Sequence, residues 1–343
     1  FLFIYSQILM SSYCYSAKDQ ILFLGLTNGK LFQYKSKTLD QSSIFKKGKD
    51  PEDTPIDSPH CHKGAIRKII YARMQEKLDV LITASADRTI KLWEPSNVKS
   101  NPCFQTIVGH EGSILDMVYI EKVNQLITSS TDRTMRIWVI DQSRQLLYYP
   151  WFVINQRIQD FTSINLTQDM DVWINCIAVQ DEEKLFVHAG DSEGSILTFK
   201  ASDDWRQKCE FSLGDDKKRG LHKFGLLQIL DLTKKESCQF TIGYDQYVNG
   251  YGKNKERFFN YPNPNKVLFT SMCWDDEGKL LYIADELGYV YIAHVYLAER
   301  ETIQKKVTKD KIKSIEVYTT ATLGSILFVF TERSMQAFRI KIG

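Results

Sequence analysis

One repeat dominates the sequence, because residues 81–93 recur closely at 126–138. Asp87 and Trp93 of the first copy correspond to Asp132 and Trp138 of the second, in each case 45 residues later. This period is expected when every repeat is one unit of four short strands joined by turns. It predicts a chain of small sheets and takes precedence over the two domains that 343 residues would otherwise suggest.

The two copies resemble the WD-repeat family, in which a Gly-His-type dipeptide is followed by an Asp and, six residues later, by a Trp. The resemblance implies a β-propeller. It also implies a buried polar network in which the Asp accepts from the His, the His meets a hydroxyl, and that hydroxyl accepts from the indole N–H. The matching residues are His62, Thr83, Asp87 and Trp93 in one repeat and His110, Thr128, Asp132 and Trp138 in the next, with Ser85 and either Ser129 or Ser130 as alternatives for the hydroxyl.

Five weaker repeats appear when the turn residue is allowed to vary. The strongest has Asp245 six residues before Tyr251 and keeps His222 and Thr241. The other pairs at this offset are Asn28 with Tyr34, Glu193 with Phe199, Leu287 with Ala293, and Glu332 with Phe338. Because Glu193 and Leu287 cannot complete the network as an Asp would, we expect their blades to depend on apolar packing.

These repeats predict an all-β fold: a seven-bladed β-propeller of four-stranded antiparallel blades that occupies residues 1–343 as a single domain. The expected three-strand cores lie near residues 8–35, 62–94, 110–140, 172–200, 222–252, 267–295 and 312–340. Outer strands are expected at 103–108, 146–153, 205–213, 256–261 and 302–307. We expect the apolar segment Phe1–Tyr5 to supply the fourth strand of the last blade and close the ring, which removes an exposed sheet edge. Because the chain begins without Met, we also expect it to be part of a longer protein.

Charge and composition narrow the choice of partners. The chain has 44 Lys and Arg against 42 Asp and Glu, so no global field attracts a polyanion, and nucleic acid is not an expected partner. No stretch approaches the roughly 20 apolar residues that a membrane-spanning helix needs, so no membrane insertion is expected. The seven cysteines are scattered without a CxxC pair, which predicts reduced thiols and a cytoplasmic location.

Fragments that resemble catalytic or metal sites have simpler explanations in the repeat. Residues 190–195 faintly resemble the nucleophile segment of chymotrypsin-like proteases, but they coincide with a blade turn in which Gly194 would supply a positive φ. The run His60-Cys61-His62 has no second ligand pair at metal-site spacing. A His, Thr and Asp set that recurs is a structural device, whereas a catalytic triad occurs once. We therefore expect no enzyme activity, cofactor, metal or small-molecule substrate.

The resemblance implies a scaffold that holds other proteins of a multisubunit complex. Contacts in this family commonly involve the turn before each third strand and the loop that enters each blade. The matching candidates are Thr27, Ala86, Thr131, Ser192, Tyr244, Glu286 and Thr331 in the turns, with Lys63 and Glu111 on the entry loops. Tyr244 is the preferred anchor because aromatic side chains dominate interface energetics.

The type of assembly is suggested only by analogy at the level of the family. Degenerate propellers with long insertions, such as 41–59 and 150–169 here, occur in cytoskeletal, ciliary and transport complexes, so we expect a cytoskeletal or ciliary (axonemal) assembly. The alternative is a substrate receptor of a ubiquitin ligase, although the WDxR box of such adaptors is absent because Glu94 follows Trp93. A nucleic-acid binder and a propeller enzyme are further alternatives without a positive signal.

Overall fold

The computed structural model describes residues 9–16, 21–35, 55–56, 61–74, 78–95, 103–123, 125–139, 162–165, 172–181, 185–201, 211–218, 221–252, 256–296, 302–320 and 324–340. Within these ranges the regular structure is almost entirely strand, with the short helices η1 (Glu121–Val123) and α2 (Thr233–Glu236). The strands form seven antiparallel sheets, which we number in chain order. This confirms the expected all-β class, and the seven sheets are consistent with a β-propeller.

Six sheets have four strands and the last has three. Sheet 1 contains β1 (Met10–Ser16), β2 (Ile21–Leu26), β3 (Leu31–Lys35) and β4 (Pro55–Ile56); sheet 2 contains β5 (Ile66–Met74), β6 (Leu78–Ser85), β7 (Ile90–Trp93) and β8 (Cys103–Ile107); sheet 3 contains β9 (Ile114–Ile120), β10 (Gln125–Ser130), β11 (Met135–Val139) and β12 (Thr162–Asn165). Sheet 4 contains β13 (Ile174–Asp181), β14 (Leu185–Asp191), β15 (Ile196–Ala201) and β16 (Phe211–Lys218); sheet 5 contains β17 (Leu226–Asp231), β18 (Cys238–Gly243), β19 (Tyr247–Gly252) and β20 (Arg257–Pro262). Sheet 6 contains β21 (Phe269–Asp275), β22 (Leu280–Asp285), β23 (Tyr289–Ala293) and β24 (Thr302–Lys306); sheet 7 contains β25 (Ile312–Thr320), β26 (Gly324–Thr331) and β27 (Met335–Arg339).

The fourth strands depart most from the sequence expectation. Sheet 1 ends in β4, which lies inside the segment 41–59 that was expected to be a loop. In sheet 3 the strand paired with β11 is β12, and the expected outer strand 146–153 lies outside the described residues. The proposed closing strand, Phe1–Tyr5, also lies outside them. A fourth strand pairs along one edge only, so the repeat places weaker demands on its sequence and position.

The inner strands of the sheets are largely buried. Every residue of β10, β18 and β22 is buried, because these strands have a neighbour on each side and packed side chains on both faces. Burial here does not require apolar residues, since β10 also encloses the polar side chains of Gln125, Thr128, Ser129 and Ser130. By contrast, four of the five residues of the edge strand β24 are exposed.

The chain divides into two compact units. The amino-terminal unit consists of Ile8–Val179 and Phe199–Gly214 and contains sheets 1 to 3, whereas the carboxy-terminal unit is formed mainly by Gln180–Thr198 and Asp215–Gly343 and contains sheets 5 to 7. The strands of sheet 4 are divided between the two units.

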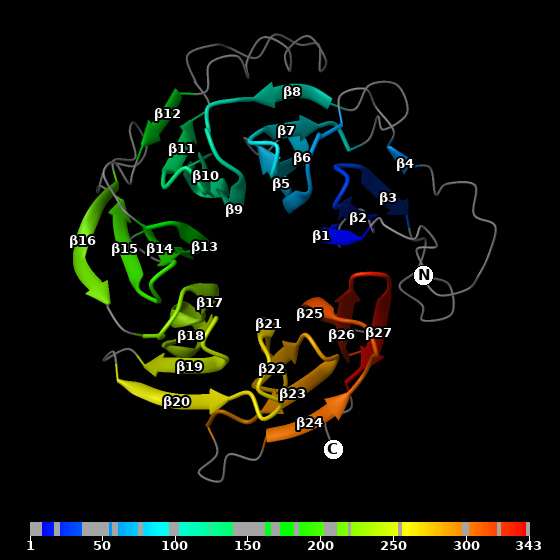
Figure 1. Ribbon diagram of the computed structural model, residues 1–343, viewed down its shortest axis with the longest axis vertical. Coiled ribbons are helices and arrows are strands. Elements are labelled where there is room, and N and C mark those ends of the chain that lie inside the picture. The colour runs from blue at the N-terminus through cyan, green and yellow to red at the C-terminus, as the bar shows by residue number, and fades with distance from the viewer. Residues whose placement is uncertain are drawn as a thin grey trace. The chain divides into compact units, whose positions relative to one another are not determined.

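In the amino-terminal unit β1, β5 and β9, the first strands of sheets 1, 2 and 3, lie side by side in that order (Figure 1). The indole rings of Trp93 and Trp138 are buried in the two apolar clusters that join sheets 1 and 2, and 2 and 3. A polar contact reinforces this packing, because the Asp116 carboxylate of β9 accepts from the backbone N–H of Ile177 at 2.8 Å and lies 3.1 Å from Lys68 Nζ of β5.

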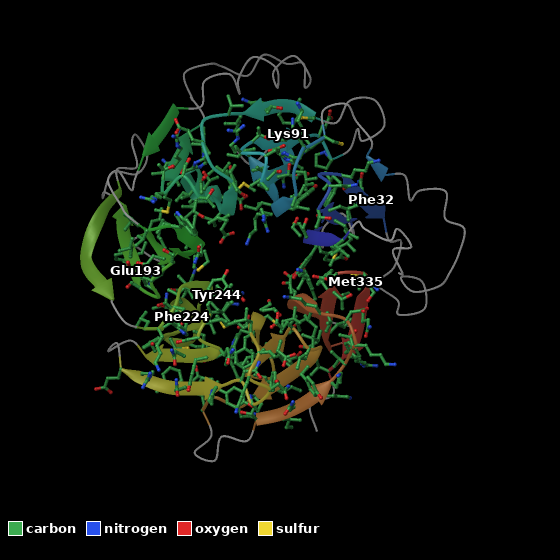
Figure 2. All side chains as sticks on the ribbon, in the orientation of Figure 1. Phe32, Lys91, Glu193, Phe224, Tyr244 and Met335 are labelled. Carbon is green, nitrogen blue, oxygen red and sulfur yellow. The ribbon has the colours of Figure 1, made fainter. Side chains whose placement is uncertain are left out.

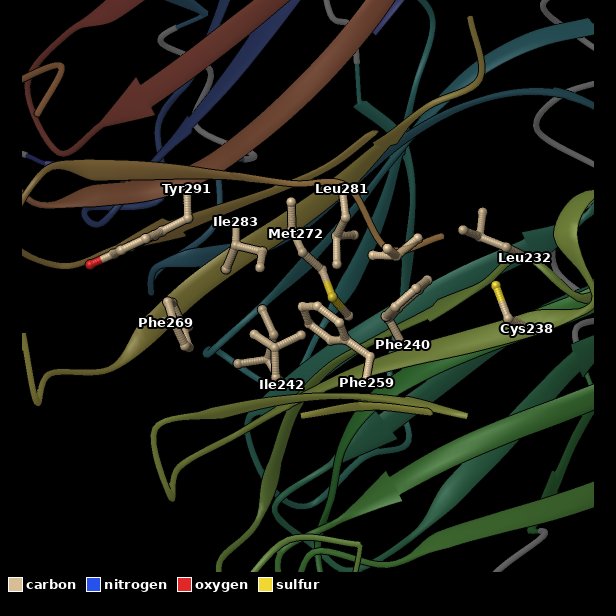
Figure 3. Close-up of a cluster of buried hydrophobic side chains, with 13 residues drawn as sticks. Leu232, Cys238, Phe240, Ile242, Phe259, Phe269, Met272, Leu281, Ile283 and Tyr291 are labelled. Carbon is tan, nitrogen blue, oxygen red and sulfur yellow. The ribbon is translucent and has the colours of Figure 1, made fainter. Parts of the chain in front are cut away.

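The carboxy-terminal unit repeats this arrangement with β17, β21 and β25 (Figure 1). Between sheets 5 and 6 the rings of Phe240, Phe259, Phe269 and Tyr291 pack together with aliphatic side chains (Figure 3). The side-chain amide of Gln228 in β17 pairs with both the backbone N–H and the carbonyl of Met272 in β21, at 2.8 and 3.0 Å. Neighbouring sheets are thus held by an apolar filling and by a polar link between first strands.

Candidate functional site

In each sheet the turn between the second and third strands lies at the same end as the segment before the first strand, because neighbouring strands are antiparallel. Backbone hydrogen bonds of 2.9 Å join these two segments in sheets 2, 3 and 5. The N–H groups of Ala86, Thr131 and Tyr244 donate to the carbonyls of Ala65, Ser113 and Gly225. We call this end of the sheets in each unit its turn face.

Four side chains of sheet 2 form a continuous polar network. His62 Nδ1 lies 3.0 Å from Asp87 Oδ2, and His62 Nε2 lies 2.7 Å from Thr83 Oγ1. The indole N–H of Trp93 donates to Thr83 Oγ1 at 2.8 Å. Because an ionised carboxylate only accepts, Nδ1 carries the proton and Nε2 accepts from the Thr83 hydroxyl. The structure therefore brings together all four residues that the repeat assigns to this network.

Sheet 3 contains the same network at nearly the same distances. His110 Nδ1 lies 2.8 Å from Asp132 Oδ2, His110 Nε2 lies 2.7 Å from Thr128 Oγ1, and the Trp138 indole donates to Thr128 at 2.8 Å. The serine alternatives do not take this position. The hydroxyls of Ser85 and Ser130 instead accept from the backbone N–H groups of Asp87 and Asp132 at 3.1 Å, which fixes the turns.

The carboxylate of each network also fastens the turn to the preceding segment. Asp87, Asp132 and Asp245 accept from the backbone N–H groups of Lys63, Glu111 and Lys223 at 2.8, 2.9 and 3.0 Å. One side chain thus satisfies a buried histidine and a loop amide at the same time.

Sheet 5 has a partial version of the network. His222 Nδ1 lies 2.7 Å from Asp245 Oδ1, and His222 Nε2 lies 2.8 Å from Thr241 Oγ1. At the tryptophan position Tyr251 directs its hydroxyl to the carbonyl of Leu221 at 3.4 Å, so no indole N–H reaches Thr241. The three residues expected from the sequence are together, but the fourth contact is replaced.

Burial and hydrogen bonding set the charges of these groups. Burial lowers the pKa of His62 and His110 below the ordinary value, against the opposing effect of Asp87 and Asp132. Burial alone would raise the pKa of the Asp132 carboxyl, but the hydrogen bonds from Thr134 and His110 outweigh it and lower the pKa to about 2. Near neutral pH the networks of sheets 2 and 3 therefore pair a neutral imidazole with an ionised carboxylate.

The networks contain the residue types of a catalytic triad but lack its accessibility. Thr83 and Thr128 are fully buried, and an indole N–H already donates to each hydroxyl oxygen. A nucleophile must be reachable by its substrate, and these hydroxyls are enclosed. The His, Thr and Asp contacts also recur in three sheets, so their role in each is to hold the turn, the entry segment and the strands in register.

Sheet 6 differs from the expectation that it would depend on apolar packing. Asp285, two residues before Leu287, is fully buried, and its Oδ2 accepts from Tyr291 Oη at 2.8 Å and Asn265 Nδ2 at 3.2 Å. Its Oδ1 accepts from the backbone N–H of Leu287 at 3.0 Å. The expectation was wrong because an Asp at the first turn position, with Asn from the entry segment and a Tyr on β23, builds an alternative network.

The turn of sheet 4 uses the same device. Asp191 Oδ1 accepts from the backbone N–H groups of Glu193 and Ser195 at 3.0 and 2.7 Å. Gly194 has φ 85°, as the sequence predicted, and a Cβ there would lie 2.4 Å from the carbonyl oxygen of His222. The protease-like segment 190–195 is therefore a turn whose geometry requires glycine.

Comparison with protein families matches the part of the chain that holds the two complete networks. A model described as WD domain, G-beta repeat, matches residues 54–94 and 101–139. The match supports assignment of these residues to the WD-repeat family. A search of curated proteins found no match. WD repeats generally mediate protein–protein interactions, and proteins built from them are typically non-catalytic scaffolds.

The candidate partner-binding residues of the WD repeats differ in exposure. The side chains of Thr27, Lys63, Glu111 and Tyr244 are exposed, and Ala86, Thr131, Ser192 and Glu286 are half-buried. Glu286 is engaged, because its Oε2 lies 2.7 Å from Lys311 Nζ and this contact lowers the pKa of its carboxyl. Thr331 is fully buried and its hydroxyl accepts from Ser334 N–H at 2.8 Å, so its assignment as a contact residue is wrong.

Sequence reasoning missed several exposed apolar residues on the turn faces. They are Val108, Trp173, Phe224 and Leu287, with exposed fractions of 71, 47, 61 and 44%. A signal was present for Phe224, since the equivalent position is Gly64 in one complete WD repeat and Gly112 in the other. The fold does not require a large apolar side chain at a position where the complete repeats have glycine.

Two other kinds of site were sought in the described part of the chain. Across those residues, no helix combines the length and apolar character needed to cross a membrane. The same residues contain no group of three or more His, Cys, Asp or Glu side chains able to hold a metal ion.

Proposed function

We propose that this WD-repeat chain is a non-catalytic scaffold that binds other proteins of a larger assembly through its turn faces. One observation carries the proposal: of the seven large apolar side chains exposed in the described residues, five lie on the turn faces. These five are Val108, Trp173, Phe224, Tyr244 and Leu287. Exposed apolar side chains gathered in one class of loop mark interaction surfaces.

Chemical cross-linking tests this proposal. The turn face of the carboxy-terminal unit has exposed lysines at 223, 266 and 309, whereas the exposed Lys235 and Lys279 lie at the opposite end of sheets 5 and 6, between the first and second strands. After lysine cross-linking of the full chain in its source cells and mass spectrometry, we expect partner cross-links at the turn-face lysines. Partner cross-links confined to Lys235, Lys279 or other lysines away from the turn faces would contradict the proposal.

The proposed assembly is cytoskeletal or ciliary, with a cytoplasmic location, and nucleic acid is not among its partners. The support is the combination of irregular repeats and long insertions, together with the balanced charge. A substrate receptor of a ubiquitin ligase is a weaker alternative, because the WDxR box is absent. The cross-linked partners themselves distinguish the two, since an adaptor would yield ligase subunits.

We also propose that the seven sheets are blades of one closed propeller and that Phe1–Tyr5 supplies the fourth strand of sheet 7. The support is that sheet 7 has three described strands while the other sheets have four. Deleting residues 1–5 is expected to expose a strand edge and promote aggregation, measured by light scattering and thermal unfolding. A truncated chain that stays monomeric and equally stable would place the closing strand elsewhere.

A further inference from the structure

Two exposed aromatic side chains lie on adjacent segments of the turn face of sheet 5. Phe224 lies in the segment before β17 and is 61% exposed, and Tyr244 lies in the turn between β18 and β19 and is 46% exposed. The backbone N–H of Tyr244 donates to the carbonyl of Gly225 at 2.9 Å, which holds the two segments together. Both side chains are labelled at sheet 5 in Figure 2.

The fold itself does not require aromatic residues at these positions. The same hydrogen bond in sheets 2 and 3 aligns Tyr244 with Ala86 and Thr131. Phe224 aligns with Gly64 and Gly112, where an added Cβ would lie 2.9 and 2.5 Å from a backbone nitrogen of the turn. Sheet 5 therefore presents two large rings where the complete repeats have small residues, and burial in this chain does not account for them.

The turn face around these rings is continuous within the carboxy-terminal unit. Backbone hydrogen bonds join each turn to the entry segment of the next sheet: His222 N–H donates to Gly194, Asn263 N–H to Gln246, and Val307 N–H to Gly288. Their lengths are 3.2, 2.9 and 3.0 Å. The segments from sheet 4 to sheet 7 therefore form one connected surface that can receive an extended ligand.

Cations outnumber anions among the exposed, unpaired charges of this surface. Lys223, Lys266, Lys309 and Arg333 are exposed, and no ion pair joins any of them to another described residue. Lys311 and Lys313 are neutralised, since they lie 2.7 and 2.8 Å from carboxylate oxygens of Glu286 and Glu332. The opposing unpaired acids are the exposed Glu193 and the half-buried Asp310. A ligand with negative charge is therefore complementary to this face.

We propose that the turn face of the carboxy-terminal unit binds an acidic segment of a partner protein, which places at least one apolar side chain against Phe224 and Tyr244. The inference rests on the proposed scaffold function and adds the chemistry of the partner. Two rings in the middle of the surface supply apolar contact, and the four separate cations around the sheet ends supply charge complementarity. Protein is favoured over nucleic acid because the cations are few and scattered rather than gathered along a basic track.

Binding of designed peptides to the full chain tests this inference. Four fluorescein-labelled peptides of equal length are compared by anisotropy: acidic with one Leu, acidic with that Leu replaced by Ala, basic with the Leu, and neutral with the Leu. We expect the acidic peptide with Leu to bind most tightly and its affinity to fall as salt is added. The variants Phe224→Ala and Tyr244→Ala are each expected to weaken it roughly tenfold or more.

Two controls separate a specific loss from unfolding. Ile303→Ala removes an equally exposed apolar side chain from β24, away from the turn face, and should leave binding unchanged. Phe224→Ala and Tyr244→Ala introduce a small residue at positions where sheets 2 and 3 also have small residues. The thermal unfolding of both variants should therefore match that of the unchanged chain. Lys223→Glu should reduce affinity for the acidic peptide and raise it for the basic one.

Several results would overturn the inference. Equal binding of the basic and acidic peptides, tighter binding of a single-stranded RNA of matched charge, no binding of any peptide, or ring variants that bind as well as Ile303→Ala would each do so. Turn-face cross-links to partners combined with one of these results would leave the scaffold function standing and reject only the acidic segment. Absence of turn-face cross-links would instead reject the scaffold function itself.

Discussion

Replacing Asp87 with Ala is expected to lower the free energy of unfolding by about 2–3 kcal/mol. The carboxylate accepts from His62 Nδ1, from the backbone N–H of Lys63 and from the backbone N–H of Thr89, at 3.0, 2.8 and 3.0 Å. Without it, His62 Nδ1 loses its charged acceptor and keeps only the contact with Thr89 Oγ1 at 3.1 Å, and the backbone N–H groups of Lys63 and Thr89 lose this acceptor as well. Leaving buried donors under-satisfied costs more than the bonds contributed. The midpoint and slope of guanidinium unfolding measure the change.

A graded pair of variants assigns this loss to the network. Asp87→Asn keeps one carbonyl acceptor of the same shape, so it is expected to cost less than Asp87→Ala. The control is Asp276→Ala, because Asp276 forms a solvent-exposed ion pair with Lys235 and its loss should change stability by less than about 1 kcal/mol. Equal stability of Asp87→Ala and Asp276→Ala would show that the Asp87 carboxylate does not fasten sheet 2.

The two complete networks were predictable because buried polar groups constrain the sequence tightly. A His, a Thr, an Asp and a Trp can satisfy one another in a blade only from fixed strand and turn positions, so the spacing of His110, Asp132 and Trp138 specifies both residue types and register. Apolar positions give a weaker signal, since many side chains can fill them. The fourth strands, which carry no network residue, are therefore harder to place from the sequence than the strands that do.

The network of sheet 6 escaped prediction because it uses other residues at another position. Asp285 and Asp191 occupy the place of Ser85 rather than that of Asp87, and a carboxylate there accepts the turn amides directly. Asn265 then takes the part of the histidine and Tyr291 that of the hydroxyl. The signal was present as an Asp two residues before Glu193 and Leu287, but the six-residue offset to an aromatic directed attention to the wrong turn residue.

The sequence indicated which residues lie in the turns, but it did not determine which of their side chains are exposed. Tyr244 and Thr331 both stand directly before the turn residue assigned from the sequence, yet the first is 46% exposed and the second is fully buried. The backbone hydrogen bonds explain the difference, because Glu332 rather than Thr331 donates to the entry segment of its sheet as Tyr244 does. Thr331 takes the place of Ser85, and its hydroxyl accepts from the turn amides as that of Ser85 does. Only the conformation of each turn determines which side chain a partner can reach.

Acid is expected to destabilise the chain in two stages as pH falls. The first stage begins below about pH 6.5, the ordinary pKa of histidine, because burial lowers the pKa of His62 and His110 in the folded chain. Between the folded and unfolded pKa values the unfolded chain binds more protons, so the free energy of unfolding falls with pH. Any group whose pKa is lowered by folding has this effect. The contribution of the two histidines to stability is therefore complete above about pH 6.5 and decreases below it.

The second stage involves the carboxylates. The pKa of the Asp132 carboxyl is about 2 in the folded chain against 3.8 ordinarily, and the pKa of Asp87 and Asp245 is also lowered, so stability is lost further as pH falls from about 4 towards 2. After allowance for solvent screening we expect about 1–2 kcal/mol from Asp132. Guanidinium unfolding at a series of pH values measures both stages.

Substitution of the histidines separates the two stages. His110→Gln removes a titrating group from sheet 3, so it is expected to flatten the pH dependence between about 6.5 and 5, although the variant is less stable throughout. His294→Gln is the matched control, because His294 belongs to none of the three networks. If stability stayed constant or rose between pH 7 and 5, the imidazoles would have to be charged in the folded chain. The contact between imidazole and carboxylate would then be an ion pair rather than a hydrogen bond from a neutral imidazole to a carboxylate.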